Sequence, residues 1–264
     1  MSTVVVMSLL RARGRIAALT LGFATFMVLV SASYASVDQN ALRSVIRVLP
    51  PAVRVLAGAA NLGTASGYLG AGYVHPAVLA MLGALVVSMG TAAGRDLDSG
   101  AAELVLSRPI APWRWLAAHT LAMLAGLTIA LAGGVAGGFI GIATVHDLGD
   151  VPAGHLLITA ANMWMLFAAL GAVSVLCAVA VPRGARAVGV AAAVIVVAYV
   201  INYLAQLWTP VRPLRPLSVF RFFDPGATMS SGSWPAHAAA VLAGWLVVCV
   251  VAAHVRVQHR ELSG

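Results

Sequence analysis

Lysine is absent from this 264-residue chain, and all 16 of its basic side chains are arginines. A P-loop needs a lysine to reach the phosphates of a nucleotide, and a Schiff base with a carbonyl substrate needs a lysine amine. ATP binding by a P-loop and catalysis by a lysine amine are therefore excluded for this chain.

Charge and cysteine are also scarce. Only 9% of the residues are charged, and the two cysteines, Cys177 and Cys249, lie in apolar runs far from any C-x-x-C or metal-ligand spacing. Hydrophobic residues make up 61% of the chain, and the mean hydropathy is +0.95. A soluble fold of this size would not bury so much apolar surface, so the composition predicts an integral membrane protein. The net charge of +8 forms no contiguous basic face, which argues against nucleic-acid binding and favours contact with lipid headgroups.

Six apolar runs are long enough to cross a bilayer as helices. We expect an all-α, polytopic membrane protein with a single domain over residues 1–264. The predicted spans are residues 16–35, 75–94, 115–141, 156–181, 187–208 and 236–254. Small residues at positions 31–35 resemble a signal-peptide cleavage site, but the first apolar run is longer than the usual 7 to 15 residues. A first span is therefore favoured over a signal peptide.

The arginines predict the orientation of these spans. Ten of the 16 fall on the side of the N-terminus, and six fall on the other side. Because arginine is enriched in cytoplasmic loops, we expect both termini to lie in the cytoplasm. The charged stretch at residues 95–110 then lies there too.

Four other segments have weaker patterns. Residues 1–15 favour a short helix along the membrane face, and residues 38–60 favour an amphipathic helix on the outer surface, broken at Pro50 and Pro51. Glycine and polar residues predict a loop up to Tyr73, and prolines predict another over residues 209–235.

Two further groups of residues allow a structural and a functional interpretation. The glycine ladder Gly133, Gly137 and Gly141 favours close packing within one subunit, with a seam between subunits as the alternative. One loop gathers His146, Asp147, Asp150 and His155. Their spacing matches no dedicated metal site and a solvated loop explains them, so no metal is predicted.

The stretch at residues 95–110 places five charges between long apolar runs and holds three of the eight carboxylates, Asp96, Asp98 and Glu103. A short helix over about residues 100–107 fits between its polar ends. Asp96 and Asp98 would then lie near the N-terminus of that helix, where its dipole favours negative charge. Such a helix is small and exposed, so it suits contact with a partner better than a role in the core.

No Asp, Glu or Arg falls in the middle of a predicted span. Proton-coupled carriers usually need such groups, so a stand-alone carrier or channel is a weaker alternative. The milder polar residues within spans are Thr128, Asn162, Asn202, Gln206 and His119. Interhelical hydrogen bonds are the commoner role for such residues, and Asn162, Asn202 and Gln206 are also candidates for a translocation path. A membrane enzyme or assembly factor is a second alternative, because Asp96 and Asp98 could hold a metal, but no second acidic pair is present in the cytoplasmic loops.

Residues 94–110 resemble the signature of ABC transporter permeases of the type-2, exporter class. Their pattern has an acidic cluster, then Gly-Thr-Leu-Glu, aliphatic positions and a proline. The matching residues are Gly100, Glu103, Leu104, Leu106 and Pro109, with Asp96 and Asp98 in the acidic cluster. The chain departs from this pattern at Ala101, where threonine is usual, and at His119, where lysine is usual. Residues 214–225 and 259–262 resemble later segments of the same family.

The resemblance implies a permease subunit that forms a homodimer or heterodimer in the inner membrane of a prokaryote. It implies that two separate ATPase subunits bind the ATP, so that the chain itself is no enzyme and needs no cofactor. Copper-maturation permeases share the pattern, but the chain has no Met or His ladder that would select that role. The residues expected to couple the permease to its ATPase are Asp96, Asp98, Gly100, Glu103, Leu104, Leu106, Arg108 and Pro109.

Overall fold

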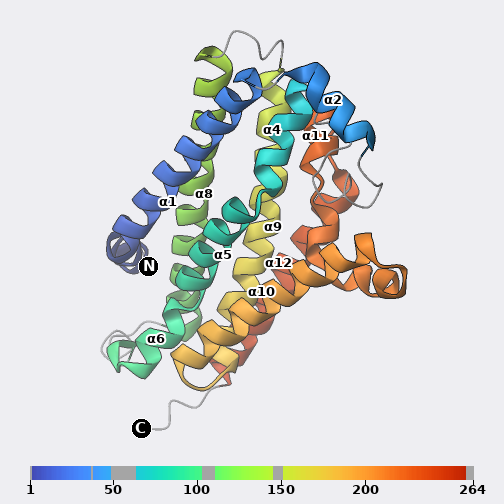
Figure 1. Ribbon diagram of the computed structural model, residues 1–264. Coiled ribbons are helices and arrows are strands. Elements are labelled where there is room, and N and C mark those ends of the chain that lie inside the picture. The colour runs from blue at the N-terminus through green and yellow to red at the C-terminus, as the bar shows by residue number, and fades with distance from the viewer. Residues whose placement is uncertain (1, 37, 49–63, 103–110, 145–150, 260–264) are drawn as a thin grey trace.

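The computed structural model describes residues 2–36, 38–48, 64–102, 111–144 and 151–259. Over these ranges the chain folds into helices, and no β-strand is present (Figure 1). Six helices in this part of the chain are long and apolar enough to cross a membrane. A helix satisfies its backbone hydrogen bonds internally, as the bilayer core requires. The prediction of an all-α, polytopic membrane protein is confirmed.

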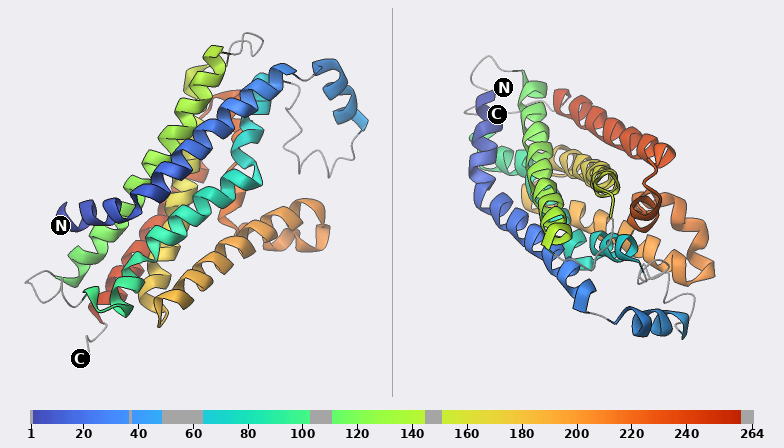
Figure 2. Two further views of the ribbon diagram at one scale, coloured as in Figure 1. Left: turned by 60° about the vertical axis from the view of Figure 1, so that its left-hand side comes forward. Right: turned by 90° about the horizontal axis from the view of Figure 1, so that it is seen from above.

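The six predicted spans correspond to helices that end within a few residues of the predicted boundaries, except at the start of the chain. They are α1 (Ser2–Ser36), α5 (Pro76–Gly90) with α6 (Ala92–Asp98), α8 (Pro112–Thr144), α9 (Ala153–Ala180), α10 (Gly184–Leu207) and α12 (Ala236–Gln258). Helix α1 begins early because the helix predicted over residues 1–15 continues into the first span without a break. Figure 2 shows its first turns bent away from the direction of the rest.

Helix α9 lies at the centre of the bundle (Figure 2). It packs against α5, α8, α10 and α12. Met163, Leu166 and Phe167 are fully buried on it. Helix α10 starts beside α6 and then leaves the bundle, so most of its length is exposed (Figure 1).

The glycine ladder of α8 faces α1 of the same chain. A Cβ atom at Gly133 would collide with Thr20, one at Gly137 with the backbone of Ala24, and one at Gly141 with Ser31. Small residues let two helix backbones approach this closely. The favoured prediction, close packing within one subunit, is confirmed.

The loop predicted up to Tyr73 is wrong over its last part, which forms helix α4 (Ala65–Val74). The helix begins where the side-chain oxygen of Thr64 accepts a hydrogen bond of 3.1 Å from the Gly67 N–H. Glycine lowers helix propensity by about 1 kcal/mol relative to alanine, but tertiary contact outweighs that cost here. A Cβ at Gly70 would lie 3.0 Å from the Pro225 carbonyl oxygen, so the glycine allows a close approach between helices.

The other predicted loop, residues 209–235, also contains helical structure. It holds the 3-10 helices η3 (Thr209–Leu217) and η4 (Val219–Phe222) and the short helix α11 (Pro225–Ser231). The amphipathic helix expected over residues 38–60 is confirmed for its first part by α2 (Gln39–Val48), and residues 49–63 lie outside the described ranges.

Candidate functional site at the charged end of the bundle

The charged stretch starts on α6, which continues the second span past Thr91. The Thr91 hydroxyl donates to the Val87 carbonyl oxygen at 2.7 Å, and the chain then resumes a helical path from Ala92. Gly94 lies against α9, where a Cβ would be 3.0 Å from the Ala178 carbonyl oxygen. This contact fixes α6 on the central helix, so the carboxylates that follow are held in defined positions.

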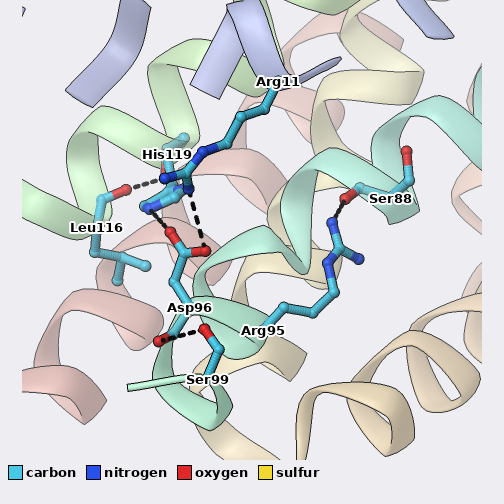
Figure 3. Close-up of polar contacts among 8 residues, drawn as sticks. Arg11, Ser88, Arg95, Asp96, Ser99, Leu116 and His119 are labelled. Carbon is cyan, nitrogen blue, oxygen red and sulfur yellow. Dashed lines mark hydrogen bonds and ion pairs between the residues drawn. The ribbon is translucent and has the colours of Figure 1, made fainter. Parts of the chain in front are cut away.

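Asp96 lies between two basic side chains from other helices (Figure 3). Its Oδ1 is 3.5 Å from an Arg11 guanidinium nitrogen on α1, and its Oδ2 is 3.4 Å from His119 Nε2 on α8. The His119 distance is longer than a normal hydrogen bond, and neither ring nitrogen of His119 has a hydrogen-bond partner among the described residues. The side chain of His119 is only 3% exposed, against 61% for Arg11. Asp96 therefore links three helices through charge.

Arg95 points away from Asp96 and folds back along α5 (Figure 3). Its guanidinium donates to the backbone carbonyl of Ser88 and, at 3.3 Å, to the Thr91 hydroxyl. These bonds span the junction between α5 and α6. Arg95 thus stiffens the point where the second span changes direction.

Asp98 joins the charged stretch to helix α10. Its carboxylate accepts a hydrogen bond from the Gly184 N–H in the first turn of α10. Arg183, just before that turn, has a φ of 67°, a conformation that few non-glycine residues adopt and that the surroundings must enforce. Gly184 allows the close approach, because a Cβ there would lie 2.9 Å from the Arg95 backbone nitrogen. A carboxylate at a helix N-terminus is also favoured by the helix dipole.

Gly100 lies between the end of α6 and the helical residues Ala101 and Ala102. Its φ is 72°, its N–H donates to the Leu97 carbonyl oxygen at 3.4 Å, and it directly follows Ser99, the cap of α6. A glycine in this left-handed conformation commonly ends a helix. Asp96 and Asp98 therefore lie in the last turn of α6, where the helix dipole disfavours negative charge. The contacts of Asp96 with Arg11 and His119, and of Asp98 with Gly184, offset this cost.

The rest of the predicted coupling residues lie beyond the described part of this stretch. These are Glu103, Leu104, Leu106, Arg108 and Pro109. Ala101 and Ala102 are helical, but the helix predicted over residues 100–107 otherwise lies outside the described residues and stays a prediction.

The three candidates for a translocation path lie on two helices. Asn162 is fully buried on α9, and neither atom of its amide has a hydrogen-bond partner within the described ranges. Gln206 donates to the Asn202 carbonyl oxygen at 3.1 Å, so these two residues share one side of α10. A path shared by all three stays a prediction. Thr128 forms the expected interhelical bond, because the Trp164 indole N–H of α9 donates to its hydroxyl at 3.0 Å.

The described residues contain no group of three or more His, Cys, Asp or Glu side chains that could hold a metal ion. His155, one of the four residues considered as metal ligands, lies in the first turn of α9, and a ring nitrogen of its side chain is 2.8 Å from the Met229 carbonyl oxygen. Residues 145–150, which include His146, Asp147 and Asp150, lie outside the described ranges. What the charged end offers is a set of ionic and hydrogen-bonded links between helices, together with exposed arginines.

The sequence identifies the carboxylates but not their partners. From the sequence alone, Arg11 reads as a marker of topology and His119 as a mild polar residue within a span. One signal was available, because the predicted orientation places Arg11, Asp96 and His119 at the same end of their spans. Comparison with known proteins adds no further assignment: no protein-family model, curated protein or solved structure matches the chain.

Proposed function

We propose that the chain is the membrane-spanning permease subunit of an ATP-driven, ABC-type transporter of the exporter class. Residues 96–109 would dock a separate ATPase subunit, as a short helix docks in a groove of its partner. The support comes from the residues that resemble the permease signature and from the six apolar helices. ATP would bind to the partner, because a chain without lysine cannot form a P-loop.

The observation that carries this proposal is the linkage of α6 to three spans. Asp96 contacts Arg11 on α1 and His119 on α8, and Asp98 accepts from Gly184 on α10. A displacement of the charged stretch would therefore act on several helices at once. Closure of two ATPases could shift the permease between inward-facing and outward-facing states through such a contact, because coupling requires an element whose position differs between the states.

Buried amides give the proposed permease a candidate path. Asn162 and the Asn202 side-chain oxygen are buried without hydrogen-bond partners in the described structure. Burying an unpaired amide is costly, so a substrate or water that hydrogen-bonds it would be favoured. On this ground we include Asn162 and Asn202 in the path, together with Gln206, which donates to the Asn202 carbonyl oxygen.

The proposed location is the inner membrane of a prokaryote, with both termini in the cytoplasm. Cysteines introduced at Ser99 and Arg183 should react with a membrane-impermeant thiol reagent only from the cytoplasmic side, and one at Ser231 only from outside. All three positions are exposed, whereas the natural Cys177 and Cys249 are buried and should react little. Labelling of Ser99→Cys from outside would contradict this orientation.

Co-expression with the P-loop ATPase encoded by a neighbouring reading frame tests the proposed function. The two proteins should co-purify from the membrane, and the complex should hydrolyse ATP, while the purified chain alone should not. ATP hydrolysis by the chain free of any partner would contradict the division of labour. Failure to retain any such ATPase would favour a stand-alone carrier.

A further inference from the structure

A small cavity opens at the charged end between α1, the α5–α6 junction and α8. Its volume is about 170 Å³. Its polar wall holds Ser8, Arg11, Arg15, Ser88, Arg95, Asp96 and His119. Its apolar wall holds Ala12, Met89, Ala92 and Ala122. One side can therefore receive a charged group while the other contacts hydrocarbon.

The charges around this cavity do not balance. Three arginines face one carboxylate, and that carboxylate already contacts Arg11 and His119. Arg95 directs its donors to the Ser88 carbonyl and the Thr91 hydroxyl. Arg15 forms neither an ion pair nor a hydrogen bond within the described part of the chain, although it shares the cavity with two other arginines. Like charges held this close favour the binding of an anion.

His119 provides an independent indication of a ligand. Its side chain is only 3% exposed and lines the cavity; its Nε2 faces Asp96 at 3.4 Å, and its Nδ1 has no partner among the described residues. Buried polar groups in native proteins are nearly always paired with protein, water or a ligand. An oxygen-rich group in the cavity would supply the missing partner, because a ring N–H is a hydrogen-bond donor.

We propose that this cavity binds a phosphate-bearing anion, and that the headgroup of an anionic phospholipid is its source. The planar guanidinium of arginine matches the geometry of phosphate oxygens. Basic pockets between spanning helices on the cytoplasmic side are known to bind lipid headgroups. The apolar wall formed by Met89 and the alanines would contact the glycerol and the first methylene groups. A bound headgroup would connect α1 to α6 beside the Asp96 contacts.

Binding to the purified full-length chain in detergent tests the proposal, with short-chain dihexanoyl-phosphatidylglycerol and inorganic phosphate as probes. The measurement is the dissociation constant from titration of the intrinsic tryptophan fluorescence or of the thermal midpoint. Arg15→Gln removes the arginine that has no partner, and we expect it to weaken phosphatidylglycerol binding about tenfold, as the loss of one charged hydrogen bond would. Arg13→Gln is the matched control, because Arg13 is exposed on the same helix and does not line the cavity.

The possible outcomes separate the sources of the ligand. Phosphatidylglycerol binding that Arg15→Gln weakens and Arg13→Gln leaves unchanged, with little binding of inorganic phosphate, supports a lipid headgroup. If inorganic phosphate binds as tightly and with the same dependence on Arg15, the anion site stands and the lipid source is wrong. Absence of binding by either probe, or an equal effect of Arg13→Gln, would overturn the site. Because the isolated chain is measured, the result does not depend on an ATPase partner.

Discussion

Helices α9 and α10 have equal mean hydropathy over their most apolar 18 residues, yet 72% of that stretch is buried in α9 and 17% in α10. Both a bilayer and a protein interior accept apolar side chains, so hydropathy predicts that a segment crosses the membrane without saying what surrounds it. Within a membrane, close packing and polar contacts decide which helices associate. Helix α9 has more of these contacts than α10.

Two hydrogen bonds join α10 to other segments of the described chain. Gly184 at its start donates to Asp98, and the Ser218 hydroxyl donates to its Ala198 carbonyl oxygen at 2.7 Å. Between these points, Val196 and Val197 are more than half exposed. This surface would meet lipid or, in the proposed dimer, a second permease subunit. The charged stretch contacts α10 at its first turn, whereas α9 is packed along its length.

A pair of glycine substitutions should give the largest difference between the two helices. A Cβ at Gly171 of α9 would collide with Met123, whereas one at Gly189 of α10 meets nothing within 4 Å. We expect Gly171→Leu to destabilise the protein by about 2–3 kcal/mol through overpacking, and Gly189→Leu to change the unfolding free energy little. Thermal unfolding of the two purified variants measures this. Equal effects would show that a second subunit or another helix covers α10.

Removing the Asp98 carboxylate should have a smaller effect, confined to α10. We expect Asp98→Ala to cost about 1 kcal/mol, because the Gly184 N–H loses its acceptor at a helix start. Asp98→Asn should cost less, since it keeps an acceptor oxygen and loses only the charge. Hydrogen exchange measured by mass spectrometry should become faster in the first turns of α10 and stay unchanged in α9. Equal acceleration in both helices would mean that Asp98 supports the whole bundle.

The hydrogen bond between α8 and α9 should give the smallest effect. Thr128→Val keeps the shape of the side chain but removes the acceptor of the Trp164 indole N–H. Such bonds contribute about 0.6 kcal/mol on average in membrane proteins, so the unfolding free energy should fall by about that amount. Thr128→Ser, which retains the hydroxyl, is the control and should behave as the wild type. A loss above about 2 kcal/mol would show that this bond, rather than packing, holds α9 in the centre.

The spans could be predicted because each is a long apolar run, and a property averaged over some twenty residues tolerates local errors. Helix α4 is not predicted, because it is short and depends on a distant contact rather than on a property averaged over many residues. Its three glycines favour a loop by their local flexibility, whereas Gly70 is needed for contact with Pro225, which lies more than 150 positions further along the chain. Local propensity contains no information about such a partner.

The candidate site shows the same contrast between features that the local sequence predicts and features that depend on tertiary contacts. The composition of residues 95–110 made the stretch stand out, because five charges lie between apolar runs. The sequence places Gly100 at a helix start, and Ala101 and Ala102 after it are helical, but the end of α6 just before Gly100 is not apparent from the sequence. The contacts of Asp96 with Arg11 and His119 join residues on three helices, so they follow from tertiary packing rather than from any local pattern.

Association between the chain and the proposed ATPase subunit, measured for variants of Gly100 and Glu103, tests the proposed coupling role most directly. Gly100→Val cannot keep the left-handed turn, whereas Gly100→Asn can, because asparagine tolerates this conformation. We expect Gly100→Val and Glu103→Arg to reach the membrane at the wild-type level and to bind the ATPase about tenfold more weakly, while Gly100→Asn binds it normally. If Gly100→Val and Glu103→Arg both retain the ATPase and stimulate its hydrolysis of ATP as the wild type does, residues 96–109 do not couple the two subunits.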